Sequence, residues 1–260
     1  LADGARHDPD ASRAVMGGRR RAGAAEDAVG TLALPAFERP LVPSPLSVPR
    51  GRRRAATSGV TARPASGETR ARRRIFIAVA LAPTLRHAVA GLEPRFSAAA
   101  NSLRWVAPDH LHFTLKFLGE ITGAEVTRAG EAARQVGART RSFAITVAGM
   151  GAFPSPRRPQ VVWAGVSDGA DRLIALAGDL DEALRRMKFP RERRPFQPHL
   201  TVARVRRSGP APDLTAILQE LGGVPVGTQA VEALLVMEST LNPSGSIYSQ
   251  VEEVRLGEVG

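Results

Sequence analysis

The chain has 260 residues, 43% of them hydrophobic, which is enough to bury the core of one large domain or two small ones. It contains no cysteine, which excludes disulfides, thiolate metal sites and a cysteine nucleophile and leaves histidine and carboxylate side chains for catalysis. No apolar run approaches the roughly 20 residues of a membrane helix, so we expect no membrane partner and a cytoplasmic location.

The formal net charge of +11 is concentrated near the N-terminus. Residues 1–74 hold 15 arginines and 7 acidic residues, whereas residues 75–260 hold 21 basic and 18 acidic residues. The longer part of the chain is therefore close to balanced, and net charge alone does not indicate a nucleic-acid partner.

Residues 1–74 are rich in Arg, Ala, Gly, Pro and Ser and show no sustained helical or strand period. This composition predicts a disordered basic extension. It could serve as an RNA-binding arm, as a targeting peptide, or have no function of its own. Seven acidic residues argue against an organellar transit peptide, and we favour the last interpretation.

The expected folded domain, residues 75–260, mixes strand-like and helix-like segments. In chain order the pattern predicts a strand at 75–81, a helix at 83–96, strands at 103–106 and 111–118, a helix at 124–136, strands at 143–150 and 160–166, a helix at 171–187, a strand at 199–205, a helix at 213–221 and strands at 230–238 and 247–256. We expect Gly119 to end the third strand, and the Gly- and Pro-rich stretch 149–159 to form a loop. Because β and α units do not alternate regularly, the pattern predicts an α+β fold with antiparallel sheets.

One short motif occurs twice, as His112-Phe113-Thr114-Leu115 and as His199-Leu200-Thr201-Val202. On a strand, a His and a Thr two positions apart project from one face, and the apolar residues project from the other. In the first copy we expect Leu111, Phe113, Leu115 and Phe117 to face a core, and His112, Thr114 and Lys116 to share the opposite face. His110 is in phase with His112 but precedes the apolar strand, so we interpret it as a loop residue.

If two lobes place these strands opposite each other, two imidazoles and two hydroxyls surround one small volume. Histidine acts as acid or base near neutral pH, and threonine hydroxyls donate to phosphoryl oxygens where charge builds up in a transition state. The set suits in-line displacement at a phosphodiester, with one histidine activating water and the other protonating the leaving oxygen. Since His7 and His87 lie away from both motifs, we expect no metal cage and no other cofactor.

With these motifs, residues 75 to about 256 resemble the bacterial and archaeal RNA 2′,3′-cyclic phosphodiesterases, historically called 2′-5′ RNA ligases, of the 2H phosphoesterase superfamily. The similar stretches are 104–106, 111–120, 151–154 and 194–204. The resemblance implies a two-lobed, pseudo-twofold arrangement of antiparallel sheets with outer helices and one motif per lobe lining a central cleft. It also implies His112 as proton donor, His199 as proton acceptor, Thr114 and Thr201 as phosphate contacts, and a 2′-phosphate as product.

Arg204 matches an arginine that the family often carries five positions after the second histidine. Strict strand alternation puts it on the face opposite His199, so reaching the cleft requires a bulge or the strand end, and a solvated surface arginine is the alternative. Phe196, Trp105 and Tyr248 are candidates for stacking on an RNA base, with core packing as the alternative.

The sequence therefore predicts a monomeric enzyme that hydrolyses RNA terminal 2′,3′-cyclic phosphodiesters to 2′-phosphomonoesters without a metal ion. Two alternatives stay open. The same site could join a cyclic phosphate to a 5′-hydroxyl, with a ribose oxygen in place of water, or the chain could be a non-catalytic RNA-binding module. The physiological partner, RNA ends or small cyclic-phosphate nucleotides, is not specified by the sequence.

Overall fold

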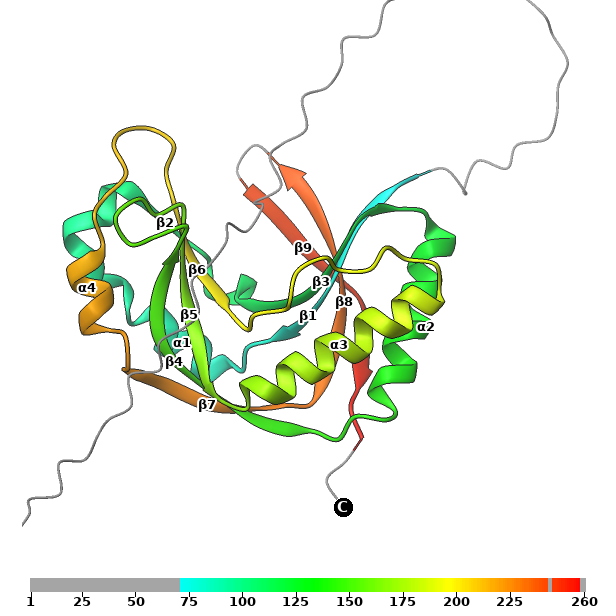
Figure 1. Ribbon diagram of the computed structural model, residues 1–260. Coiled ribbons are helices and arrows are strands. Elements are labelled where there is room, and N and C mark those ends of the chain that lie inside the picture. The colour runs from blue at the N-terminus through cyan, green and yellow to red at the C-terminus, as the bar shows by residue number, and fades with distance from the viewer. Residues whose placement is uncertain (1–70, 243–244, 258–260) are drawn as a thin grey trace, which may run out of the picture. The chain divides into compact units, whose positions relative to one another are not determined.

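Two antiparallel sheets form the framework of the protein (Figure 1). The computed structural model describes residues 71–242 and 245–257, all within one compact unit. The first sheet has the strand order β3-β1-β8-β9, and the second has the order β2-β6-β5-β4-β7. Each motif lies on a different sheet, so the α+β architecture with one motif per lobe is confirmed.

In the described residues, the strands are β1 (Arg73–Ala80), β2 (Leu103–Trp105), β3 (His112–Ile121), β4 (Phe143–Phe153), β5 (Val161–Asp168), β6 (Leu200–Val205), β7 (Pro225–Val231), β8 (Ala233–Asn242) and β9 (Gly245–Arg255). The α-helices are α1 (Pro83–Ala90), α2 (Gly123–Gly137), α3 (Ala170–Arg186) and α4 (Thr215–Glu220). Two 3-10 helices, η2 (Glu93–Ser102) and η3 (Pro108–His110), precede β2 and β3.

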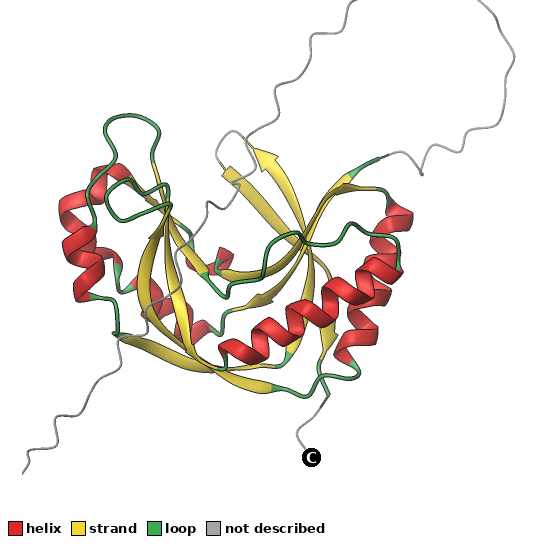
Figure 2. Ribbon diagram, viewed as in Figure 1, coloured by secondary structure: helices red, strands yellow, loops and turns green. Residues whose placement is uncertain are grey.

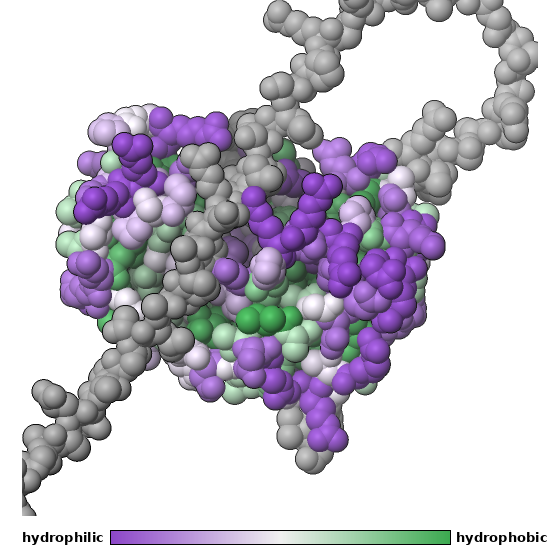
Figure 3. All heavy atoms as spheres, in the orientation of Figure 1, coloured by the Kyte–Doolittle hydropathy of each residue, from purple (hydrophilic) through white to green (hydrophobic). Residues whose placement is uncertain are grey.

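The helices lie on the outer sides of the two sheets (Figure 2). Helices α2 and α3 pack together, α2 against β8 and β9 and α3 against both β3 and β5, whereas α1 contacts β7 and α4 contacts β4. Helix α1 thus follows a strand of the first sheet but packs on the second, and α3 packs against a strand of each sheet. Hydrophilic side chains gather over α2 and α3 on the face seen in Figure 3. None of the described helices is long and apolar enough to cross a membrane.

Local sequence explains where the two long helices begin and which side they bury. Thr122 caps α2 in a capping box with Glu125, each side chain bonding to the other's backbone N–H. Helix α3 buries the leucine stripe that its spacing predicts. The buried residues of α3 are Leu173, Leu176, Ala177, Leu180, Ala183 and Leu184.

A β-bulge follows the threonine in each motif strand. Between β1 and β3, Ala78 pairs with Thr114 and Ile77 with Lys116, so Leu115 is an extra residue. Between β5 and β6, Trp163 pairs with Thr201 and Val162 with Ala203, so Val202 is the extra residue. A bulge lets two consecutive side chains face the same way and reverses the phase of the residues after it.

The bulge corrects one prediction about β3. Lys116 does not share the face of His112; it is buried on the helix side, whereas Phe117 is 57% exposed and lies beside Phe76 on the His112 face. The ring centroids of Phe76 and Phe117 are 5.9 Å apart. Simple alternation was wrong beyond Leu115 because it takes no account of the extra residue.

Several element boundaries also differ from the predictions. Strand β1 begins at Arg73, two residues before the expected start of the folded domain, because Arg73 pairs with Ile121 on β3; its guanidinium also forms an ion pair with Glu238 on β8. Of the extension expected at 1–74, residues 1–70 lie outside the described residues. Gly119 does not end β3 but occupies a second irregularity of the strand, with φ of 74°.

Three further segments differ from the sequence pattern. The helix expected at 83–96 is two helices, α1 and η2, which meet after Gly91. Strand β4 continues to Phe153 into the expected loop, where Phe153–Pro154 is a cis peptide. The strand expected at 230–238 is the end of β7 followed by most of β8.

Close packing between β4 and β5 explains a glycine in the stretch 151–154. Gly151 pairs with Trp163, and a Cβ at Gly151 would lie 2.2 Å from the indole ring. The Trp163 ring in turn packs on Phe153, with centroids 5.3 Å apart. Glycine at this position therefore lets the buried indole lie flat across β4.

Gly151→Ala is expected to lower the free energy of unfolding by about 1–3 kcal/mol, because a rigid ring must move to admit the methyl group. The matched control is Gly178→Ala on the exposed side of α3, where a Cβ meets nothing within 4 Å. That change is expected to be neutral or stabilising by up to about 1 kcal/mol. Denaturant unfolding measures both, and equal stability of the two variants would contradict this packing.

Candidate active site

His112, the first residue of β3, is held by its backbone and by two aromatic rings. Its Nδ1 lies 2.7 Å from the carbonyl oxygen of His110. Because a carbonyl can only accept, Nδ1 carries the proton and Nε2 is the nitrogen left for other partners. The ring centroids of Phe76 and Tyr248 lie 4.9 and 5.4 Å from that of His112.

His199, immediately before β6, is held in the same way. Its Nδ1 lies 2.9 Å from the carbonyl oxygen of Gln197, again two residues upstream. The ring of Phe153 packs edge-on at 5.3 Å between centroids. Both histidines therefore have the same tautomer and offer Nε2 for proton transfer.

Arg204 shares the face of the second motif because of the bulge at Val202. Val202 and Ala203 are both fully buried, and the phase reversal places exposed Arg204 on the face of Thr201. Burial lowers the pKa of His112 and of His199, and the Arg204 charge lowers each pKa further, while the bonds to the carbonyls oppose these effects. One guanidinium within electrostatic range of both rings indicates that the two motifs share one site, and strands β3 and β6 contact each other directly.

Thr114 and Thr201 lie two positions after their histidines, and both are half-buried. Among the described residues, neither hydroxyl has a hydrogen-bond partner. Before each bulge the strands alternate normally, so each hydroxyl projects on the face of its histidine. Both hydroxyls remain available to a ligand.

The three aromatic candidates have different surroundings. Phe196 is partly buried against the main core. Trp105 also packs against this core, edge-on to Phe96 at 5.4 Å. Tyr248 contacts both His110 and His112, at 5.1 and 5.4 Å between centroids. His110 ends η3, where its carbonyl orients His112.

The sequence did not single out two rings that pack on the histidines, Phe76 and Phe153. Periodicity assigns Phe76 only to a strand and Phe153 only to a loop, and neither assignment indicates a neighbour in space. Phe153 lies in the stretch 151–154, which is similar to the family, but this similarity does not indicate that its ring packs on His199.

Lys116 connects the β3 strand to the segment that leads to His199. Its Nζ lies 2.7 Å from Oδ1 of Asp181 on α3 and donates to the carbonyl of Pro190 at 3.2 Å. The backbone N–H of Glu192 donates to the same Asp181 oxygen. The ion pair is nearly dry, with side-chain exposures of 6% for Lys116 and 15% for Asp181.

In the part of the chain that the structure describes, no three His, Asp or Glu side chains come together as a metal site. The candidate site brings together the two imidazoles, the two threonine hydroxyls and the Arg204 guanidinium.

Comparison with known proteins gives one consistent result. The profile of the 2′-5′ RNA ligase superfamily matches residues 81–238, which include both motifs. A Methanothermobacter thermautotrophicus protein named RNA 2′,3′-cyclic phosphodiesterase is 35% identical over 183 residues, covering 70% of this chain and 98% of the relative. A protein of the same name from Aeropyrum pernix is 35% identical over 158 residues, covering 61% of this chain and 89% of the relative.

Solved structures agree with the sequence relatives. A Thermus thermophilus protein superposes with a TM-score of 0.61 at 28% identity, covering 70% of this chain and 97% of that one. E. coli LigT complexed with 3′-AMP superposes with a TM-score of 0.57 at 25% identity, covering 71% and 98%.

Lys116→Met is expected to lower the free energy of unfolding by roughly 3 kcal/mol, because it leaves Asp181 as a buried carboxylate without its main partner. Adding Asp181→Leu is expected to recover most of that loss. Lys188→Met, at the exposed second lysine of the chain, is the matched control. Denaturant unfolding measures all three, and an undiminished stability of Lys116→Met alone would contradict a structural role for the pair.

Arg204→Gln is expected to move both limbs of the kcat/KM profile of the free enzyme to higher pH. The sign follows because the Arg204 charge lowers both histidine pKa values, so its removal raises them. Arg139→Gln, at an exposed residue just after α2, is the control. Limbs that stay in place while activity falls would show that Arg204 acts on the substrate alone.

Proposed function

The chain belongs to the 2′-5′ RNA ligase superfamily, and we propose that it hydrolyses 2′,3′-cyclic phosphodiesters at RNA ends, with His112 and His199 as the proton-transfer groups. The observation that carries this proposal is the matched pair of imidazoles. Each has Nδ1 fixed on a backbone carbonyl and Nε2 available, and both lie within range of Arg204.

In the proposed reaction each Nε2 carries out one proton transfer. His199 removes a proton from water as the water oxygen attacks phosphorus, and the bond from phosphorus to O3′ breaks as His112 protonates O3′. The products are a 3′-hydroxyl and a 2′-phosphomonoester. Which histidine is acid and which is base follows from the family resemblance, since the geometry of the two is alike.

The remaining groups stabilise charge on the phosphoryl oxygens. The Arg204 guanidinium offers paired N–H donors to a phosphate, and the hydroxyls of Thr114 and Thr201 supply neutral donors. The anionic phosphate would favour protonated histidine and so oppose the lowering of the pKa of His112. Phe196 and Tyr248 remain candidates for contact with a base.

All these groups come from residues 75–260 of a single chain, so the proposal requires neither the N-terminal residues nor a second copy. It also requires no metal ion, because the two histidines perform both proton transfers. Exhaustive chelation accordingly belongs in the turnover assay, as a control that should leave the rate unchanged.

Turnover of a dinucleotide with a 2′,3′-cyclic phosphate tests the proposal, with the product position identified by chromatography. His112→Ala and His199→Ala are each expected to lower kcat by about 10²- to 10⁴-fold, and the double variant by little more, because the two groups act in one pathway. His87→Ala, an exposed histidine on α1, is the matched control.

A nitrophenyl phosphodiester separates the two roles, because its leaving group needs no proton. His112→Ala is expected to be largely rescued on that substrate and His199→Ala is not. Rescue of His199→Ala instead would reverse the assignment. Full activity of both single variants on the dinucleotide would place the active site elsewhere.

A further inference from the structure

Four arginines line a cavity beside the cleft, and we propose that they bind a second phosphate of the substrate. The cavity of about 340 Å³ is lined by Arg104, Arg204, Arg206, Arg207, Val205 and Ser208. We infer that it holds the phosphate on the 5′ oxygen of the terminal nucleoside, the group through which an RNA chain continues. This inference rests on the proposed function, since it takes the cyclic phosphate to lie at the histidines.

The positive charge of the cavity is unbalanced. Arg104 and Arg204 lie directly opposite each other on β2 and β6, an arrangement of like charges that destabilises a sheet. Within the described residues none of the four cavity arginines forms an ion pair with an acidic group, whereas Arg134 and Arg185 elsewhere do. An anion in the cavity would satisfy charges that the protein itself leaves uncompensated.

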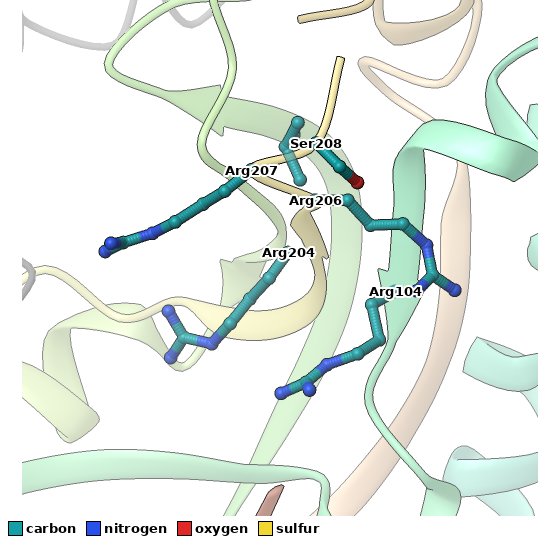
Figure 4. Close-up of a pocket in the computed structure, with 6 residues that line it drawn as sticks. Arg104, Arg204, Arg206, Arg207 and Ser208 are labelled. Carbon is teal, nitrogen blue, oxygen red and sulfur yellow. The ribbon is translucent and has the colours of Figure 1, made fainter. Parts of the chain in front are cut away.

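The arrangement of Arg104 and Arg204 in the cavity also suits a phosphate. Figure 4 shows Arg104 and Arg204 extending side by side from adjacent strands, with Arg206 and Arg207 extending away from each other on the segment that follows β6. Guanidinium groups are planar and carry paired N–H donors, which match phosphate oxygens. The volume lies within the range of pockets that hold small ligands.

The cavity adjoins the histidine site through Arg204. This residue lines the cavity and shares the face of Thr201 on β6, so it connects the two regions. Arg206 follows the end of β6, two residues beyond Arg204 and at most about 7 Å farther along the chain. One nucleotide of an extended RNA strand covers a comparable distance. A cyclic phosphate at the histidines would thus put the next phosphate near the cavity.

The consequence is a preference among substrates. A nucleoside 2′,3′-cyclic phosphate without a 5′-phosphate occupies only the histidine site. A dinucleotide ending in a cyclic phosphate also fills the arginine cavity. A mononucleotide carrying both a 5′-phosphate and the cyclic phosphate tests whether the phosphate alone is recognised or the continuing chain as well.

The test compares kcat/KM on these three substrates, and on the dinucleotide with an uncharged methylphosphonate linkage. Arg204 is left intact because it serves the histidines. In the triple variant Arg104→Gln/Arg206→Gln/Arg207→Gln, the advantage of the dinucleotide over the unphosphorylated mononucleotide is expected to fall roughly tenfold or more. Arg139→Gln is the control, and thermal unfolding checks that the exposed substitutions leave the fold intact.

A second readout does not depend on turnover. Calorimetric titration with a dinucleotide bearing a terminal 2′-phosphate should show about tenfold weaker binding by the triple variant, and binding by the variant should depend less on salt concentration because fewer charged contacts are made. If the 5′-phosphorylated mononucleotide gains as much in kcat/KM as the dinucleotide does, the cavity recognises the phosphate alone. If the dinucleotide gains more, the cavity also recognises the continuing RNA chain. An unchanged dinucleotide advantage in the triple variant, together with full activity on the methylphosphonate, overturns the subsite. Absence of turnover on every cyclic phosphate rejects the proposed function instead.

Discussion

One extra residue in each motif strand determines which side chains meet at the cleft. Without the bulges at Leu115 and Val202, alternation would turn Arg204 toward the core and bring Lys116 to the cleft. With the bulges, each motif strand buries two consecutive side chains. The fifth residue after the histidine then lies on the same face as the histidine. That position is Phe117 in one lobe and Arg204 in the other. The lobes thus share a backbone plan, while the charge of the site comes from one lobe only.

The site balances burial against charge. Aromatic rings pack on both imidazoles, and the resulting desolvation favours their neutral forms. The carbonyl oxygens of His110 and Gln197 fix the orientation of the rings by accepting a hydrogen bond from Nδ1. This bond leaves each ring free to be neutral or charged, because Nδ1 keeps its hydrogen whether or not Nε2 is protonated. A phosphate would supply the opposing charge. Protonation of one imidazole is therefore linked to the presence of an anion. This suits a site in which one imidazole must be protonated while the other is neutral.

The sequence predicted most elements that depend on local periodicity and failed where pairing with another strand decides the structure. His112 and Thr114 were assigned to one face because no bulge separates them, whereas Phe117 and Lys116 lie beyond one. Leucine spacing predicted α3. Strand β7 was largely missed because Pro225 and Gly227 hide its period, and pairing with β4 forms it nonetheless. The cavity arginines were not grouped, since Arg104 and Arg207 are distant in the chain and meet only through the pairing of β2 with β6.

Neither half of the chain contains a complete sheet. The first sheet joins β1 and β3 to β8 and β9, and the second joins β2 to β4, β5, β6 and β7, so each sheet takes strands from both sides of α2. Helix α1 follows a strand of the first sheet but contacts β7 of the second, where Gln229 bonds to the backbone of Ala80 and Ala82 at the start of the helix. The two lobes therefore depend on each other for folding, and the first sheet cannot be complete until the C-terminal strands β8 and β9 have been synthesised.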